Sequence, residues 1–234
     1  MSNIYEKYPF SFLVLSVCLL FAEGAPAQGV LISDFDDGLQ GWSEGSPLAC
    51  GINAFGGNLE WYPAGGNPQG YIRSVDAAGH AGGTNSVLAP AILTGDLSQV
   101  GGLTWDALLP NGASWTPDIL IEGQNGTCYR SDPGLLPSQP FLTWFTKRVS
   151  FESEDGWTRI GPGVESFSSV VTNVKALYIE LEVVSGLSVE ASIDNVRTVG
   201  STSQAAVSVP LPALVFWVSF ILIGTIGISA RNRI

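Results

Sequence analysis

The sequence predicts an all-β fold, a jelly-roll β-sandwich with one short helix, together with an N-terminal signal helix and a C-terminal transmembrane helix. Three observations support this prediction. Short runs of alternating apolar and polar residues fill the middle of the chain, glycine pairs and other turn residues separate these runs, and a single segment has the apolar spacing of a helix. Many short strands with one small helix are typical of a sandwich of two sheets.

The first 27 residues are typical of a secretory signal peptide. Lys7 precedes an apolar stretch, residues 10–22, and Ala25-Pro26-Ala27 has the small-residue pattern of a cleavage site. We therefore expect residues 1–27 to be removed on export. An uncleaved N-terminal anchor remains an alternative. A lipoprotein is a further alternative, although it would need a cysteine just after the cleavage site, whereas Cys18 lies inside the apolar stretch.

Residues 28–200 form the predicted sandwich domain, which is long enough to bury a core of its own. This segment carries 19 acidic and 7 basic residues, a net charge of −12. Such a surface repels phosphate backbones, so nucleic acid is not expected as a partner. The charge suits an exported protein and can attract divalent cations.

Alternation with a period of two identifies the strands. In residues 176–184 the apolar side chains of Leu177 and Ile179 fall on one face, and Tyr178 and Glu180 fall on the other. Half-buried antiparallel strands show this pattern. The same alternation predicts three further strands, at residues 103–109, 118–122 and 188–197.

One segment has helical spacing instead. Phe167, Val170, Val171 and Val174 are spaced i, i+3, i+4 and i+7, which places them on one face of a helix. We expect a short helix over residues 166–174, covering one end of the sandwich.

Two cysteines remain after the signal peptide is removed, Cys50 and Cys128. An even number of cysteines in an exported protein predicts a disulfide between them. Two buried free thiols are the alternative.

Acidic residues near both ends of the domain suggest a calcium ion. In many jelly-roll modules an ion ties the first strand to the last, and the matching oxygen ligands here are Asp34 and Asp36 near the start and Asp194 and Asn195 near the end. An EF-hand is excluded because Gly45 stands where that loop needs a glutamate. The alternative is a solvated turn at the first pair and a surface strand at the second.

Aromatic residues beside loops are candidates for sugar binding, because exposed rings stack on sugar faces. Trp61, Tyr62 and Trp115 lie next to segments rich in proline and glycine and are the predicted sugar-binding residues. Trp105 alternates with apolar neighbours, and Trp42 follows a turn, so both are expected in the core.

Catalytic groups are sparse in the sequence. The single histidine, His80, lies in a glycine-rich loop, and there is no G-x-S-x-G motif. Asp118 and Glu122 share a strand face but are about 13 Å apart, too far for the carboxyl pair of a glycosidase. We therefore predict a protein without catalytic activity. A hydrolase that uses two other carboxylates stays open.

The end of the chain predicts a membrane segment. Residues 201–208 are small and polar and indicate a linker. The uncharged residues 213–230 would form a helix of about 27 Å, enough to cross a bilayer core. The basic end, residues 231–234, would stay on the cytoplasmic side.

The segment before this helix is more specific. Val209, Pro210, Leu211 and Pro212, followed by an apolar helix and a short basic end, resemble the PEP-CTERM sorting signal of Gram-negative bacteria. Leu211 stands where the commonest motif has glutamate. The resemblance implies processing of residues 209–234 by an exosortase at the inner membrane and transfer to the cell surface or extracellular matrix. A permanent single-pass anchor is the alternative.

A second resemblance covers most of the domain. The blocks "SVLAPAILTGDLSQVGGLTWDALL", "DILIEGQNGTCY", "FLTWFTKRVSFESEDGWTRI", "SFSSVVTNVKALYIELEVVSG" and "SIDNVR" occur in the order seen in laminin B (laminin type IV) domains. The resemblance implies a jelly-roll sandwich acting as a structural module of extracellular matrix. It carries over no site residues, and the cysteine pair is not part of its pattern.

Together these observations predict an exported, non-catalytic protein of the cell surface or of an exopolysaccharide matrix, sorted by an exosortase. The alternative function is a carbohydrate-binding module with an aromatic sugar-stacking site. The expected partners are the exosortase, extracellular polysaccharide and, before processing, the membrane.

Overall fold

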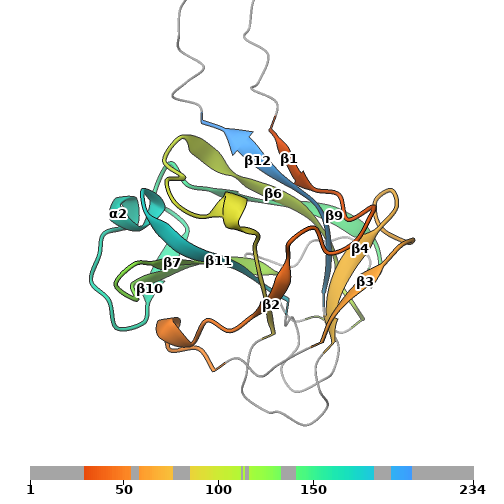
Figure 1. The fold of residues 1–234 in the computed structure, drawn as a ribbon, viewed down its shortest axis with the longest axis horizontal. Coiled ribbons are helices and arrows are strands. Elements are labelled where there is room, and N and C mark those ends of the chain that lie inside the picture. Colours follow the sequence, from red (N-terminus) through yellow and green to blue (C-terminus); the bar gives the residue numbers. More distant parts are fainter. Residues whose placement is uncertain are drawn as a thin grey trace, which may run out of the picture. The chain divides into compact units, whose positions relative to one another are not determined.

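Two antiparallel sheets pack face to face in the computed structural model (Figure 1). It describes residues 29–53, 58–75, 85–111, 113, 116–132, 141–181 and 191–201. All of them belong to one compact unit, Ala25–Ser201. The predicted signal peptide, the linker beyond Ser201, the sorting signal with its transmembrane helix, and Trp115 lie outside the described residues. Within the described part, no helix has the length and apolar character needed to cross a membrane.

Six strands of the described chain form the first sheet, in the order β3-β4-β12-β6-β9, with β1 also paired to β12. Because the first and last strands, β1 and β12, lie side by side, the two ends of the domain meet in this sheet. The strands are β1 (Leu31–Ser33), β3 (Asn58–Tyr62), β4 (Tyr71–Val75), β6 (Val100–Leu108), β9 (Trp144–Ser150) and β12 (Ser192–Gly200).

The second sheet, also six-stranded in the described residues, has the order β10-β8-β7-β11-β5-β2. Its centre is the pair β7 and β11, whose register places Asp118 opposite Glu180 and Leu120 opposite Tyr178. The strands are β2 (Ser43–Gly45), β5 (Ser86–Leu88), β7 (Asp118–Gly123), β8 (Cys128–Ser131), β10 (Trp157–Ile160) and β11 (Val174–Glu180).

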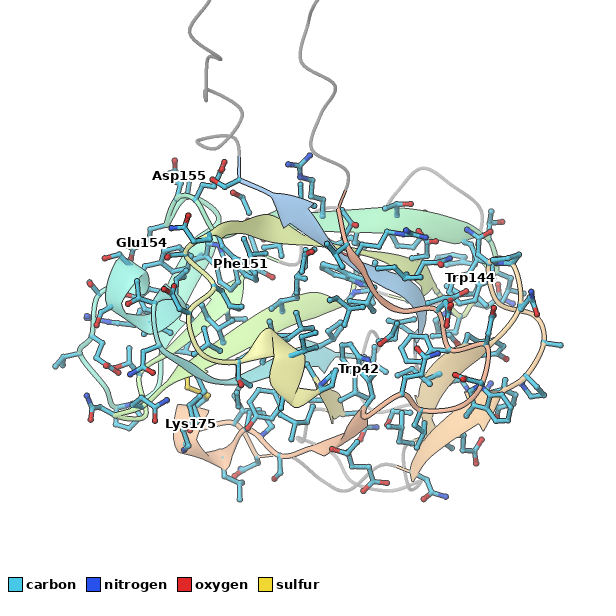
Figure 2. All side chains as sticks on the ribbon, turned by 45° about the horizontal axis from the view of Figure 1, so that its top comes forward. Trp42, Trp144, Phe151, Glu154, Asp155 and Lys175 are labelled. Atoms are coloured by element: carbon cyan, nitrogen blue, oxygen red, sulfur yellow. A yellow bond between two sulfur atoms is a disulfide. The ribbon has the colours of Figure 1, made fainter. Side chains whose placement is uncertain are left out.

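The core lies between the sheets and follows the predicted alternation. Trp105 from β6 meets Ile121 and Ile179 from the second sheet's inward face, and all three are at most 1% exposed. Burying each such side chain stabilises the fold by about 1.5–3 kcal/mol. Trp42 also lies between the sheets (Figure 2), where its indole N–H donates to Ser33 Oγ at 2.8 Å. The predicted core positions of both tryptophans are confirmed.

The predicted helix is confirmed in position, but it is shorter than predicted. Helix α2 spans Phe167–Val171 at one end of the sandwich (Figure 1). Ser166 caps it by accepting the backbone N–H of Ser169 at 3.3 Å. The last residue of the apolar pattern, Val174, already belongs to β11. Two short 3-10 helices complete the fold, η1 (Leu48–Cys50) and η2 (Ala91–Leu93).

The predicted disulfide is also confirmed. Cys50 in η1 and Cys128 in β8 are bonded, with Cα atoms 5.5 Å apart. The alternative of two free thiols is therefore wrong for this structure. The bond holds η1 against the face of the second sheet that points away from the core.

Candidate functional site

The outward face of the second sheet is covered rather than solvated. All six residues of β7 are buried, although every second one points away from the core. The outward residues include two acids, Asp118 and Glu122, and the facing strand adds a third, Glu180. Antiparallel sheets usually leave such a face in water. Buried carboxylates need partners, so their surroundings decide what this face can do.

One half of this face is apolar. Leu120, Ala176, Tyr178 and the Cys50–Cys128 bond form a small cluster separate from the main core. Three partly buried side chains pack against that cluster: Ile52, Leu88 and Ile160. The disulfide thus helps to build an apolar surface next to the polar groups.

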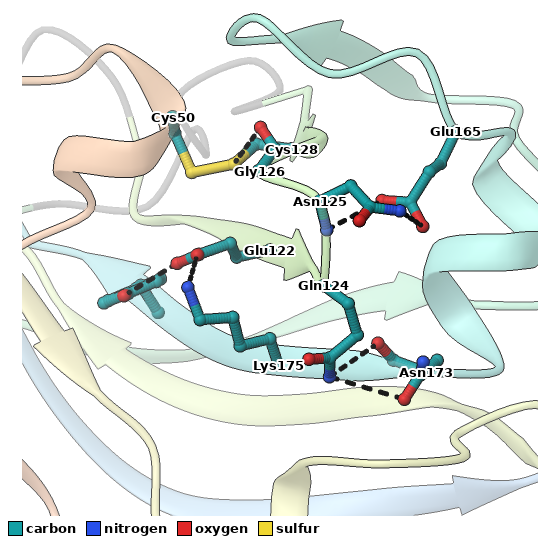
Figure 3. A network of polar contacts seen from close by, with 10 residues as sticks. Cys50, Glu122, Gln124, Asn125, Gly126, Cys128, Glu165, Asn173 and Lys175 are labelled. Atoms are coloured by element: carbon teal, nitrogen blue, oxygen red, sulfur yellow. Dashed lines mark hydrogen bonds and ion pairs between the residues drawn. A yellow bond between two sulfur atoms is a disulfide. The ribbon is translucent and has the colours of Figure 1, made fainter.

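A lysine and a tyrosine satisfy one of the three acids. Lys175 Nζ lies 2.5 Å from Glu122 Oε1, and the Tyr178 hydroxyl donates to Glu122 Oε2 at 3.2 Å (Figure 3). Burial, helped by the Glu122 charge, raises the pKa of Tyr178 to about 12. Tyr178 is therefore a neutral donor at physiological pH, and Lys175, half exposed, is reached from solvent.

The other two acids share one arginine. Arg130 Nε lies 2.7 Å from Asp118 Oδ2 and 2.7 Å from Glu180 Oε2. Its N–H is directed at Asp118, so the contact with Glu180 is an ion pair without a hydrogen bond. Both carboxylates are about 1% exposed, whereas the arginine side chain is 36% exposed. The guanidinium is thus partly exposed, while the two acids that it contacts are buried.

Burial and the neighbouring Asp118 together raise the pKa of Glu180 to about 8, against the opposing effect of Arg130. Burial also raises the pKa of Asp118. Two carboxylates this close share one proton at neutral pH, and we place it mainly on Glu180. The three residues together then carry no net charge.

Several side-chain oxygens on this face of the second sheet have no hydrogen-bond partner. They are Ser86 Oγ, Asp118 Oδ1 and both carboxyl oxygens of Glu180, all buried. Ser86 lies opposite Glu180 in the register of β5 and β11, so these groups form one row across three strands. A proton shared within the acidic pair joins one oxygen of Glu180 to Asp118 Oδ1 and so satisfies two of them. Each of the others costs about 1–3 kcal/mol, and native proteins contain few such groups.

The shared proton predicts a stability that falls as pH rises. The folded state binds the Glu180 proton more tightly than the unfolded chain, where the pKa is 4.5, so stability decreases between about pH 4.5 and 8. Glu180→Gln should flatten the upper part of this slope, from pH 6.5 to 8. Urea unfolding at several pH values measures it. The exposed Glu154→Gln is the control, and an unchanged slope in Glu180→Gln would contradict the assignment.

The predicted metal residues are partly brought together. Asp194 in β12 is fully buried and accepts backbone N–H groups of Asn67 and Asn195 at 2.6 Å each. Burial raises its pKa to about 6, and the charges of Asp106 and Asp36 contribute. The charge of Asp36 thus acts on Asp194, and a shared ion stays a prediction.

Asp34 makes its hydrogen bond outside this cluster, because its Oδ1 accepts from Gln40 Nε2 at 2.6 Å. Asp106 and Asn67, which the sequence did not single out, belong to the cluster instead. Across the described ranges, no group of three or more histidine, cysteine or acidic side chains is arranged to hold a metal ion.

The predicted sugar-binding aromatics are separated by the strand geometry. Neighbours on β3 point to opposite faces, so Trp61 and Tyr62 cannot form one surface. Trp61 is 38% exposed, and its indole N–H donates to Phe35 O at 2.6 Å. Tyr62 stacks on Tyr71, with ring centroids 4.8 Å apart. The third predicted residue, Trp115, lies outside the described residues.

Comparison with solved structures identifies the class of fold. The solution structure of CtCBM11 matches with a TM-score of 0.50 and 17% identity, covering 76% of this chain and 98% of that one. The family 11 carbohydrate-binding module of cellulase Lic26A-Cel5E from Clostridium thermocellum has a TM-score of 0.49 and 16% identity, covering 75% and 96%.

A third similar structure is the CBM22-1 xylan-binding domain from Paenibacillus barcinonensis Xyn10C, with a TM-score of 0.42 and 14% identity, covering 76% and 98%. Neither a protein-family model nor a curated protein sequence matches the chain. At these identities the likeness concerns the fold alone: the protein has the jelly-roll sandwich that carbohydrate-binding modules also have.

Proposed function

We propose that this protein is a non-catalytic module that binds a polysaccharide on the outward face of its second sheet. The observation that carries the proposal is Arg130, whose side chain is 36% exposed and is held by the buried Asp118 and Glu180. Sugar hydroxyl groups can accept hydrogen bonds from the exposed part of this guanidinium. The fold likeness to carbohydrate-binding modules supports the proposal.

The face has the composition of a sugar site. Binding sites are mostly apolar with a few placed polar groups. Here Tyr178 and the partly buried Leu88 lie next to the polar row, two residues along their strands, and Leu88 can contact the apolar face of a sugar ring. The net charge of the chain, −11, disfavours an anionic polymer. We therefore propose a neutral polysaccharide as the ligand.

The same geometry argues against a glycosidase. Glycosidases hold their two carboxyl groups apart, about 5 Å or more, so that the sugar lies between them. Asp118 and Glu180 both contact one nitrogen of Arg130, which occupies the space a sugar would need. The raised pKa of Glu180 follows from burial against another acid and does not indicate an acid catalyst.

Affinity electrophoresis of the full chain tests the proposal. We expect at least one neutral gel polymer, among mixed-linked β-glucan, xylan and mannan, to retard the protein, and alginate not to. Arg130→Lys keeps the charge but loses the planar geometry, so we expect it to weaken binding at least tenfold. Arg148→Lys, on an exposed position of the other sheet, is the matched control. No retardation in any neutral polymer would overturn the proposal.

The predicted location extends the proposal. Export, sorting by an exosortase and the laminin B resemblance rest on the sequence blocks quoted above. A polysaccharide-binding sandwich on the cell surface would hold the protein in an extracellular polymer layer. We propose this as its role, and we propose that the sorting motif at residues 209–212 directs the protein to the cell surface.

The calcium ion stays a prediction. Asp36 and Asp194 would supply its carboxylate ligands, although N–H groups already bond both oxygens of Asp194. An ion that binds only the folded state raises the melting temperature. We therefore expect EDTA to lower the melting temperature and added Ca²⁺ to restore it. The same melting temperature with and without EDTA would contradict a structural ion.

A further inference from the structure

A second cluster of aromatic residues lies on the outward face of the first sheet. Register places Tyr62 opposite Tyr71 and Glu60 opposite Arg73, on the face that points away from the core. Trp144 comes from β9 on the same face, because it pairs with the outward Leu108. Tyr71 and Trp144 meet edge to face, with ring centroids 5.7 Å apart.

Hydrogen bonds hold these rings in place. The Trp144 indole N–H donates to Gly65 O at 3.1 Å. The Tyr62 hydroxyl donates to Glu60 Oε2 at 2.5 Å and accepts from Arg73 Nη2. The hydrogen bond to Glu60 raises the pKa of Tyr62, which therefore keeps its proton. Because the indole N–H of Trp144 already donates to Gly65 O, the part of Trp144 left for a ligand is its ring.

One donor in this cluster has no acceptor. Arg73 Nε is buried and makes no hydrogen bond, while the Arg73 guanidinium lies over the Tyr62 ring at 4.8 Å from its centroid. A buried N–H left unpaired costs about 1–3 kcal/mol. Because the Arg73 side chain as a whole is 39% exposed, a ligand oxygen can approach the exposed part of the guanidinium. Glu60 and the net charge of −11 disfavour an anion here, so a neutral oxygen is the better match.

We propose that Trp144, Tyr71 and Arg73 form a second sugar-binding surface, which takes a neutral sugar ring by stacking and by a hydrogen bond to the arginine. Partly exposed aromatic rings beside polar groups suit this ligand. The identity of the polymer rests on the proposed function; the surface itself does not, because it lies on the other sheet.

Two surfaces on opposite faces have a functional consequence. The sheets of a sandwich are about 10 Å apart, so one sugar residue cannot contact both outward faces. One protein molecule would then hold two polymer chains or two stretches of one chain. Such linkage strengthens retention without any new contact.

Calorimetric titration of the full chain with cellohexaose, xylohexaose and mannohexaose tests the proposal. At oligosaccharide concentrations where a site weakened tenfold stays mostly empty, we expect two sites per wild-type molecule, one in Trp144→Ala, one in Arg130→Lys and none in the double variant. Trp144→Leu keeps apolar bulk without a flat ring and should also show one site, which guards against misfolding of the alanine variant. Phe141→Ala, an exposed aromatic three residues away, is the control and should keep two sites.

The outcomes separate the two proposals. One site in the wild type that Arg130→Lys removes would overturn the second surface and leave the proposed function standing. One site that only the Trp144 variants remove would overturn the location proposed on the second sheet and support the aromatic surface. Binding of none of the three oligosaccharides would overturn both.

Discussion

Arg130→Met should lower the free energy of unfolding by about 2–4 kcal/mol at pH 7, because it removes the cation that contacts both Asp118 and Glu180 and leaves the two carboxyl groups buried beside each other. Removing one partner of a fully buried pair costs more, but the Arg130 side chain is 36% exposed and water screens part of the effect. Urea unfolding followed by fluorescence measures the change.

The size of this loss should depend on pH. Because burial raises the pKa of both carboxyl groups, they take up protons as the pH falls, and the cost of removing the arginine shrinks. Arg148→Met, at an exposed position on the edge strand β9, should change stability by less than about 0.5 kcal/mol. A loss in Arg130→Met that is equal at pH 5 and pH 8 would show that packing, and not the charge of the acidic pair, causes it.

Removing the disulfide should have a comparable effect. The Cys50→Ala, Cys128→Ala double variant should lose about 3–4 kcal/mol, because the bond closes a loop across a sequence separation of 78 residues. Loss of the bond also frees η1 from the sheet face that carries Leu120 and Tyr178. We therefore expect weaker polysaccharide binding at a temperature where the variant is still folded.

Reduction of the wild-type protein provides the control for this variant, because it breaks the same bond without changing the sequence. Both treatments should shift the urea midpoint in the same direction and by a similar amount. A double variant as stable as the oxidised wild type would show that contacts around η1 hold this segment without the covalent link.

Much of the fold could be predicted from local patterns. The alternation at residues 118–122 and 176–184 identified β7 and β11, and helical spacing identified α2, because each pattern is a property of neighbouring residues. The cysteine count predicted the disulfide because exported proteins pair their cysteines. For the strands and the helix, the physical cause lies within a short stretch of chain.

The candidate site could not be predicted in this way. Asp118 and Glu180 are 62 positions apart and meet only through the register of β7 and β11. Alternation placed Glu180 on the outward face, which is right, but a strand pattern does not reveal whether that face is covered. The sequence therefore indicated a solvated glutamate where the structure has a buried one.

The aromatic surface shows the same limit. Tyr62 was a candidate because it precedes a loop, but its neighbours Tyr71 and Trp144 come from β4 and β9. Trp61, next to Tyr62 in the sequence, points to the opposite face. Adjacency in sequence thus grouped two residues that the strand separates, and it missed two that the sheet brings together.

We propose that a neutral sugar binds beside Arg130 on the outward face of the second sheet. An NMR titration that follows the side-chain Nε–H signals of the arginines tests it most directly. With a neutral hexasaccharide that the protein binds, we predict a saturable shift of the Arg130 signal and none of Arg148. Saturable binding that leaves the Arg130 signal unmoved would contradict the account.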